Sequence, residues 1–247
     1  MFPIRDLNPT RITPVLTIAL IAINIFVFLF WQPRDNVEQE TEFLYEYAAV
    51  ACEYTTGEPL TEEEIVFDRC IDDASATPLF PDKNIWLAGL VSMFLHGGVA
   101  HIFSNMWFLW IFGNNVEEAY GTLGYLMLYL ISGIGATAAF VVANPEATVP
   151  MIGASGAIAG VLGAYLVLFP THRVLTLFFF LFVHVPAAVY LAFWFLLQFA
   201  YQEIGVAWEA HVGGFIVGVL LTLPLRSLLL ERVRRLHEPV PRFRMLR

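Results

Sequence analysis

Long runs of apolar residues dominate this chain of 247 residues. A helix needs about 20 predominantly apolar residues to cross the hydrocarbon core of a bilayer. Six runs approach that length, at approximately 13–31, 101–116, 122–143, 151–169, 174–201 and 208–230. A seventh, at 85–95, is too short to cross, and we expect it to lie at the interface or to re-enter the membrane. The sequence therefore predicts an all-α, polytopic membrane protein with a bundle of six transmembrane helices.

The scarcity of charged residues supports this prediction. They make up 14% of the chain, whereas soluble domains carry about 25%, and the mean hydropathy is +0.67. Too few charged side chains are present to cover a surface that faces water. The first apolar run follows Arg5 and Arg11, as in a secretory signal, but no small-x-small cleavage site follows it. We expect this run to be retained as a helix.

Charge is distributed unevenly along the chain. Residues 32–84 hold 14 of the 22 acidic residues and three basic ones, whereas seven of the 13 basic residues lie from Arg226 onward. Because Lys and Arg near span ends favour the cytoplasmic side, we expect both termini to be cytoplasmic and the acidic loop to face outward. The predicted organisation is a cytoplasmic segment at 1–12, a membrane domain at 13–230 with an acidic external insertion at 32–84, and a basic cytoplasmic tail at 231–247. The tail is expected to contact lipid headgroups and not nucleic acid.

Cys52 and Cys70, the only cysteines, both lie in the acidic insertion. A disulfide is plausible because the exterior is oxidising, and two unpaired thiols are the alternative. No histidine lies within the insertion, so the pattern does not indicate a metal site, and no cofactor is expected.

Strongly polar side chains enter three of the apolar runs. They are costly in hydrocarbon and usually face a bundle interior or a water-filled cavity. His101 and Asn105 share one face of the second run, Ser155 lies near the start of the fourth, and His211 lies near the start of the sixth. With the N-terminus inside, the second, fourth and sixth spans all begin on the outer side. The topology therefore predicts that these four residues lie at similar depth.

Small residues accompany the serine and the second histidine. Gly156 and Gly160 lie beside Ser155, and Gly214 and Gly218 share a face with His211. Such stripes let membrane helices approach closely, which would bring the hydroxyl within reach of the imidazole. A serine becomes a good nucleophile only when a base takes its proton, and free N–H groups at a helix start can hold an oxyanion. Packing alone is the alternative explanation for the stripes.

The spacing of these residues resembles that of the rhomboid intramembrane serine proteases, from about residue 96 to residue 218. The G-x-S-x-G motif of other serine hydrolases does not fit, because Ala157 stands in place of its last glycine. Four elements carry the resemblance: Gly153-Ala154-Ser155-Gly156 around the nucleophile, Ala210-His211 with Gly214 and Gly218 around the base, His101-x-x-x-Asn105 preceded by His96, and Gly113 to Glu117 followed by Gly121.

The resemblance implies a catalytic dyad of Ser155 and His211 without a third, acidic member. It further implies oxyanion contacts from His101, Asn105 and Ala154. Structural roles fall to the remaining motif residues: Gly153, Gly156, Gly214, Gly218 and Glu117. The expected substrates are single-span membrane proteins, cut near the outer membrane surface after a small residue. The expected location is a bacterial inner membrane, with the lipid bilayer as the other partner.

Two departures from the family pattern bear on the base. Family members often have an aromatic residue four positions after the serine, where this chain has Ala159. We therefore expect Trp208 or Phe215 to position His211. The Trp-Arg pair of the first loop is also not evident, because Leu87 follows Trp86. Two other functions compete: a non-catalytic rhomboid-like protein that binds membrane clients, and a small transporter or channel lined by the histidines and Asn105.

Overall fold

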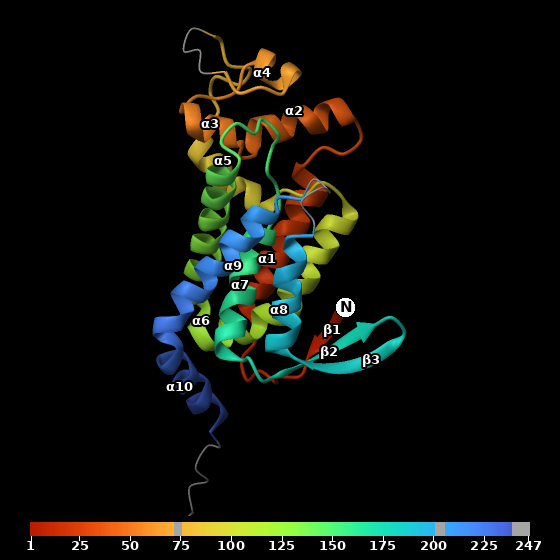
Figure 1. The fold of residues 1–247 in the computed structure, drawn as a ribbon, viewed down its shortest axis with the longest axis vertical. Coiled ribbons are helices and arrows are strands. Elements are labelled where there is room, and N and C mark those ends of the chain that lie inside the picture. The colour runs from red at the N-terminus through yellow and green to blue at the C-terminus, as the bar shows by residue number, and fades with distance from the viewer. Residues whose placement is uncertain (72–75, 201–205, 239–247) are drawn as a thin grey trace, which may run out of the picture.

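A computed structural model describes residues 1–71, 76–200 and 206–238. It is mostly helical, as predicted (Figure 1). The elements in chain order are β1 (Phe2–Asp6), α1 (Val15–Phe26) with a π-helical continuation η1 (Val27–Trp31), α2 (Val37–Tyr47), α3 (Ala51–Thr56), α4 (Glu62–Phe67), α5 (Ile85–Val91), η2 (Ser92–Phe94), α6 (Val99–Ala143), α7 (Ser155–Leu168), β2 (Arg173–Phe178), β3 (Leu181–Pro186), α8 (Ala187–Gln198), α9 (Trp208–Thr222), η3 (Leu223–Leu225) and α10 (Arg226–His237).

Gly121 divides α6 into two arms. Its φ of 72° and ψ of 164° interrupt the helix, and the bend falls in the gap predicted between the runs at 101–116 and 122–143. Glu118, at the bend, contacts His237 of α10, whereas Asn144, just after the second arm, bonds to Glu209 at the start of α9. The two arms therefore run in opposite directions between the ends of the bundle.

In the part of the chain that the structure describes, two helices are long and apolar enough to cross a membrane, namely Val99–Ala143 and the continuous segment Trp208–His237. The other apolar helices near the predicted runs are shorter: Val15–Trp31, Ser155–Leu168 and Ala187–Gln198. At 12 residues, α8 rises only about 18 Å, less than the roughly 30 Å of a typical hydrocarbon core.

The predicted span at 174–201 is wrong over its first half, and the fold is consequently not all-α. Residues Arg173–Phe178 and Leu181–Pro186 form an antiparallel hairpin, to which β1 adds in the order β1-β2-β3. Val174 and Thr176 are buried while their neighbours are less so, which is the two-residue period of a strand. Total hydropathy does not separate such a segment from a helix. Tyr201, the predicted end of the span, lies outside the described residues.

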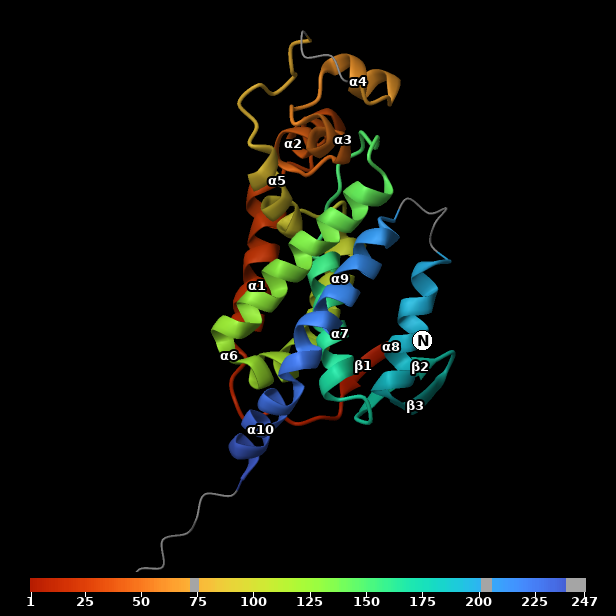
Figure 2. The same ribbon diagram turned by 60° about the vertical axis from the view of Figure 1, so that its left-hand side comes forward.

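Helices α7 and α9 lie side by side through their small residues (Figures 1 and 2). A Cβ atom built on Gly214 would overlap the carbonyl oxygen of Gly156, and one on Gly218 would overlap that of Gly160. The backbones are thus in direct contact, the close approach expected of small residues in membrane helices. Ala159, also on α7, is fully buried.

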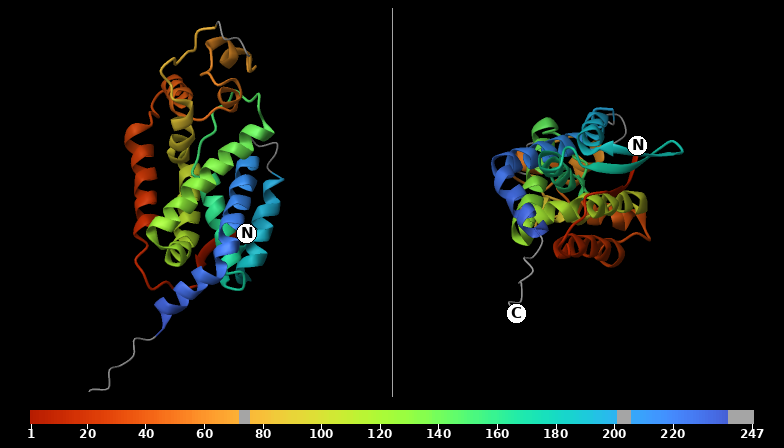
Figure 3. Two further views of the ribbon diagram at one scale, coloured as in Figure 1. Left: turned by 90° about the vertical axis from the view of Figure 1, so that its left-hand side faces the viewer. Right: turned by 90° about the horizontal axis from the view of Figure 1, so that it is seen from below.

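Opposite ends of the bundle carry different elements. Helices α2, α3 and α4 of the insertion lie at one end, whereas the sheet and α10 lie at the other (Figures 1 and 3). We call these the insertion end and the basic end. At the basic end, Glu117 accepts hydrogen bonds from the backbone N–H groups of Leu16 and Thr17, at 2.9 and 2.8 Å. The carboxylate thus satisfies free donors in the first turn of α1, where negative charge is also favoured.

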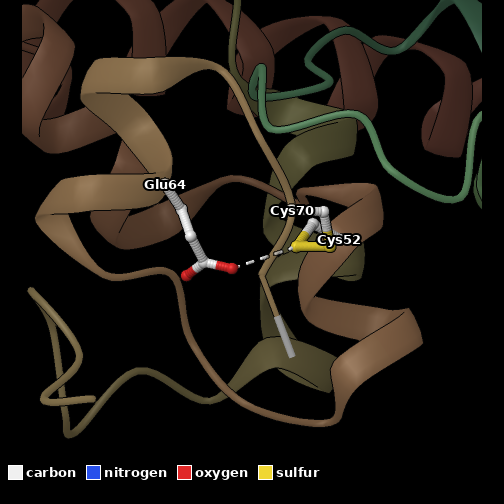
Figure 4. A group of neighbouring side chains, drawn as sticks. All are labelled: Cys52, Glu64 and Cys70. Atoms are coloured by element: carbon white, nitrogen blue, oxygen red, sulfur yellow. Dashed lines mark hydrogen bonds between the residues drawn. A yellow bond between two sulfur atoms is a disulfide. The ribbon is translucent and has the colours of Figure 1, made fainter. Parts of the chain in front are cut away.

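A disulfide joins Cys52 to Cys70 in the insertion (Figure 4), which settles the question left open by the sequence. Next to it, Lys83 Nζ lies 2.7 Å from the carboxylate of Glu53, and both side chains are almost completely buried. Burial lowers the pKa of the Lys83 ammonium and raises that of Glu53. This pair joins the end of the insertion to α3.

Candidate active site

Ser155 is the first residue of α7, and its hydroxyl faces His211 of α9. Ser155 Oγ lies 2.8 Å from His211 Nε2, a normal hydrogen-bond distance. Contact between the glycine stripes of α7 and α9 explains this short separation, because one Cβ atom between the backbones would push the helices apart. The structure therefore brings together the two residues predicted to form the dyad.

The other nitrogen of the His211 ring contacts Gln198, the last residue of α8. Nδ1 lies 2.7 Å from Gln198 Oε1. The amide nitrogen of Gln198 donates to the carbonyl of Trp194 at 2.8 Å, so the amide oxygen is the atom that faces the ring. An oxygen can only accept, so Nδ1 carries the ring proton and Nε2 is left free to accept the hydroxyl proton of Ser155.

The aromatic neighbour of His211 also differs from the prediction. Trp194 of α8 lies with its ring centroid 6.2 Å from that of His211. Phe215 packs against Trp194 at 6.0 Å, and Trp208 packs against Phe199 at 5.2 Å. The sequence predicts a positioning group on α9, whereas the contacts with His211 come from Gln198 and Trp194 of α8. Gln198 was detectable as an amide inside an apolar run, the same signal that marked the histidines.

His101 of α6 also lies close to Ser155. A Cβ atom built on Gly153 would stand 2.8 Å from His101 Nε2 and 3.4 Å from Ser155 Oγ, so glycine leaves an open space between these two groups. The φ of Gly153 is +123°, in the region that favours glycine. His101 Nδ1 lies 3.4 Å from the backbone nitrogen of Gly97. Accepting from Gly97 leaves the proton on Nε2, which faces this space.

The remaining predicted oxyanion residues are Asn105 and Ala154. Asn105 lies one turn after His101 on α6, is 6% exposed, and its Nδ2 has no hydrogen-bond partner among the described residues. Ala154 is fully buried and immediately precedes α7. The N–H groups that follow it belong to the first turn of α7, where a helix provides no internal acceptor. Hydrogen-bond donors from α6 and from the first turn of α7 are therefore available near Ser155.

A cavity of about 20 Å³ lies beside Ser155, room for about one water molecule. Among the residues lining it are Met93, Gly133, Ala136 and Gly156. A Cβ atom on Gly133 would overlap the Met93 side chain, and one on Gly156 would come within 2.5 Å of the Ala136 methyl group. The walls are therefore closely packed, and small side chains set the size of the cavity.

The insertion contacts the segment that leads into Ser155. The backbone N–H of Met151 donates to the carbonyl of Ala49 at 2.8 Å, and that of Cys52 donates to Ala147 at 3.0 Å. Ser92 joins both sides, because its hydroxyl accepts from Ala49 N–H and its carbonyl accepts from Gly153 N–H at 2.9 Å. The insertion is thus part of the support of the active-site loop.

Within residues 1–71, 76–200 and 206–238, one group of side chains has the proximity of a metal site, namely Cys52, Glu64 and Cys70 (Figure 4). The two sulfurs are bonded to each other, so neither is a thiolate, the form that binds metals. Glu64 Oε1 lies 3.6 Å from Cys52 Sγ. Because a disulfide sulfur has no S–H group, this is a van der Waals contact. The chemistry of this group is that of a disulfide.

Comparison with known proteins places these residues in a family. The family model of the rhomboid domain matches residues 83–228, a range that contains both Ser155 and His211. Rhomboid protein 1, mitochondrial, of Saccharomyces cerevisiae is 29% identical over 216 residues, 83% of this chain and 51% of the relative. Rhomboid protease GluP of Bacillus subtilis is 33% identical over 133 residues, 54% of this chain and 25% of the relative.

A third relative is rhomboid protease AarA of Providencia stuartii, 31% identical over 122 residues, or 41% of this chain and 43% of that protein. The chain thus spans about half or less of the length of these relatives. The rhomboid domain, in contrast, extends over more than half of the chain. The chain therefore belongs to the rhomboid family of integral membrane proteins.

Proposed function

We propose that this chain is an intramembrane serine endopeptidase with a dyad of Ser155 and His211. The observation that carries the proposal is the hydrogen bond of 2.8 Å between the serine hydroxyl and Nε2 of the histidine, at a ring nitrogen that the Gln198 contact leaves free to accept. The names of two relatives, rhomboid proteases GluP and AarA, support it.

The first step is attack of Ser155 Oγ on the carbonyl carbon of a substrate peptide bond, while His211 Nε2 takes the hydroxyl proton. His211 then gives this proton to the leaving amine as the C–N bond breaks, which leaves an ester on Ser155. Water then attacks the ester while His211 Nε2 takes its proton, and His211 returns this proton to Ser155 Oγ as the C–O bond breaks and the acid product leaves. Gln198 accepts from Nδ1 throughout, and it holds the ring in the orientation that both transfers need.

Charge develops on the carbonyl oxygen during each attack. Free N–H groups in the first turn of α7, His101 Nε2 and the unpartnered Asn105 Nδ2 are the donors proposed to receive it. Donors fixed before the reaction stabilise such an oxyanion strongly, because they do not have to reorient. The left-handed Gly153 keeps the space between His101 and Ser155 open for this oxygen.

The proposed substrates are single-span membrane proteins cut after a small residue. The cavity beside Ser155 has room for about one water molecule, which is close to the size of a methyl group, and Gly133, Ala136 and Gly156 are among the residues that line it. A peptide bond within a regular helix is shielded by its neighbours and hydrogen bonds. We therefore expect cleavage where the substrate helix is easily unwound near the membrane surface.

We propose six membrane crossings, with the insertion end outside and the basic end in the cytoplasm. The crossings are α1 with η1, the two arms of α6, then α7, α8 and α9. Arg11, Arg173 and the arginines of α10 lie toward the basic end, in agreement with the charge rule for cytoplasmic segments. A bacterial inner membrane remains the proposed location, and a disulfide at the insertion end agrees with an oxidising exterior.

Two alternatives lead to different experimental results. A non-catalytic rhomboid-like protein would bind membrane clients without cutting them, and a transporter or channel would use the same histidines to line a path. Neither function needs a hydrogen-bonded serine and histidine. The geometry of Ser155 and His211 therefore favours the protease.

A fluorophosphonate probe tests the dyad directly, because it labels a serine that a neighbouring base activates. We expect labelling of the wild type at Ser155, and none in Ser155→Ala or His211→Ala. Ser227→Ala is the matched control, since Ser227 is exposed on α10 and its loss should leave labelling unchanged. Labelling that persists in His211→Ala would contradict the dyad.

Cleavage of a panel of single-span substrates in vesicles tests the reaction. The panel varies the residue before the expected cut from Ala through Val to Phe. We expect cleavage by the wild type of the Ala substrate, weaker cleavage as the residue grows, and none by Ser155→Ala. Binding of the panel without cleavage by the wild type would support the non-catalytic alternative.

A further inference from the structure

The hairpin of β2 and β3 ends in five consecutive exposed apolar residues. Phe178 is 44% exposed, and the other four are more so: Phe179 78%, Phe180 93%, Leu181 66% and Phe182 67%. We call these residues the hairpin tip. Contiguous apolar surface of this kind is rare on a surface that faces water and usually marks an interaction site.

The turn of the hairpin holds a phenylalanine in a strained backbone conformation. Phe179 has a φ of +52°, a left-handed conformation that bulky residues rarely adopt and that turns normally fill with Gly, Asn or Asp. The register is fixed on either side, because Phe178 pairs with Leu181. A polar residue or glycine would relieve the strain, so the phenylalanine points to a role for its side chain.

The position of the hairpin relative to α8 indicates which environment surrounds the hairpin tip. Seen along the bundle in the right-hand view of Figure 3, the hairpin extends sideways beyond the helices. In Figure 1 it lies at the level of the lower end of α8, which follows β3 directly. Helix α8 has its own exposed apolar residues, Val189, Phe193 and Leu196, which share one helical face. In an integral membrane protein such a face contacts lipid.

We propose that the hairpin tip inserts into the membrane and anchors the basic end of the bundle in the leaflet that surrounds it. The occupant of this surface is lipid. Two exposed arginines lie at the base of the same sheet, Arg5 on β1 and Arg173 on β2, where anionic headgroups would meet them. An apolar tip with cationic residues behind it is the composition of an interfacial membrane anchor.

The depth of insertion follows from the backbone. Strand β3 is the last in the order β1-β2-β3, so its outer edge has N–H and C=O groups without a neighbouring strand. Such groups are not tolerated in the middle of the hydrocarbon core. The tip therefore lies at the boundary between headgroups and acyl chains. Helix α8 follows β3 directly, so the hairpin lies at the start of this helix, at the basic end of the bundle and next to this boundary.

Site-directed spin labelling tests the proposal. The chain has only two cysteines, and they are bonded to each other, so Phe180→Cys introduces one reactive thiol. The labelled protein is placed in vesicles of phosphatidylcholine and phosphatidylglycerol, and the collision rates of the nitroxide with oxygen and with a water-soluble nickel chelate are measured. Leu196→Cys on the lipid-facing side of α8 and Glu63→Cys on the exposed α4 are the matched references.

We expect the label at 180 to fall between the two references, with several-fold fewer nickel collisions and more frequent oxygen collisions than at 63, and with shallower burial than at 196, which lies nine residues beyond the start of α8. Nickel collisions at 180 equal to those at 63 would place the tip in water and overturn the proposal. Line broadening that grows with the ratio of protein to lipid would show a second copy on the tip, and would also overturn it. The measurement does not depend on the proposed protease activity.

Discussion

Gln198 Oε1 and Ser155 Oγ lie on opposite edges of the His211 ring, at 2.7 and 2.8 Å from its two nitrogens. The resemblance to the rhomboid proteases implies a serine and a histidine without a third, acidic member. The structure adds an amide that has no charge but orients the ring as a carboxylate does in other serine hydrolases. The glycine stripes pack α7 against α9 and do not include α8. The Gln198–His211 contact connects α8 to this pair.

Replacement of Gln198 by Leu should lower kcat roughly ten- to a hundredfold with little change in KM, because an unpaired buried donor costs about 1–3 kcal/mol. Gln198→Glu keeps an acceptor opposite Nδ1 and should retain more activity than Gln198→Leu. Leu196→Ala, on the exposed face of α8, is the control and should leave kcat unchanged. Steady-state kinetics on a cleavable single-span substrate measure all three. Equal losses in the Leu and Glu variants would argue against a positioning role.

Gly153→Ala should abolish cleavage while the protein stays folded. A methyl group there would stand 2.8 Å from His101 Nε2, in the space proposed for the oxyanion, and the φ of +123° is unfavourable for alanine. Gly57→Ala is the matched control, since Gly57 has a φ of +84° but no atom within 4 Å of the added carbon. Both variants should lose about 1–2 kcal/mol of stability, the cost of a Cβ atom in a left-handed conformation, and only Gly153→Ala should lose activity. Thermal melting and cleavage assays separate the two effects.

Loss of the disulfide should reduce activity through the loop before Ser155. The variant Cys52→Ser with Cys70→Ser should destabilise the insertion by about 3 kcal/mol and lower the cleavage rate. The reason is that Cys52 N–H donates to Ala147 and the Ala49 carbonyl accepts from Met151. Limited proteolysis of the insertion and initial rates check the prediction. A reducing agent should slow the wild type and leave the double variant unaffected; equal rates for reduced and oxidised wild type would contradict it.

Asp6 should make the stability of the protein depend on pH. Burial raises the pKa of its carboxyl from 3.8 to about 6, so the folded state favours the protonated form. Such a group stabilises the fold fully below the unfolded pKa and loses this effect as pH rises through about 6. Unfolding free energy should therefore fall between about pH 4 and 6, by up to about 3 kcal/mol for this group.

Asp6→Asn, which has no charge to bury, should flatten this part of the pH profile. Denaturant unfolding in detergent at pH 4, 5, 6 and 7 measures it. Asp35→Asn is a suitable control, because Asp35 is exposed and its charge remains in water. An identical slope in the wild type and Asp6→Asn would show that other groups cause the dependence.

Much of the helical bundle and of the candidate site was predictable because polar residues and small residues are informative in an apolar chain. Ser155 and His211 were expected to meet through glycine stripes, and the backbone contacts of Gly214 with Gly156 are the reason they do. The two arms of α6 were predicted as separate runs, since Gly121 and its neighbours interrupt the hydropathy.

The hairpin and the Gln198 contact were not predicted, for different reasons. Residues 173–186 are as apolar as a membrane helix, and the deciding signal is their period of two, which a hydropathy sum does not detect. Gln198 is an amide inside an apolar run, as Asn105 is, but the spacing of residues along the chain does not pair it with His211. Its partner is 13 residues away on another helix, and helix packing of this kind is not encoded in local spacing.

The backbone pairing of Ala49 with Met151 connects the insertion to the active-site loop, so a molecule bound to the insertion can affect that loop. An antibody fragment or macrocycle that binds helices α2–α4 of the insertion would act on the segment of chain that leads to Ser155, four residues after Met151. Reagents raised against these helices do not have to resemble a substrate or compete with one. They can be selected directly for slower or faster turnover.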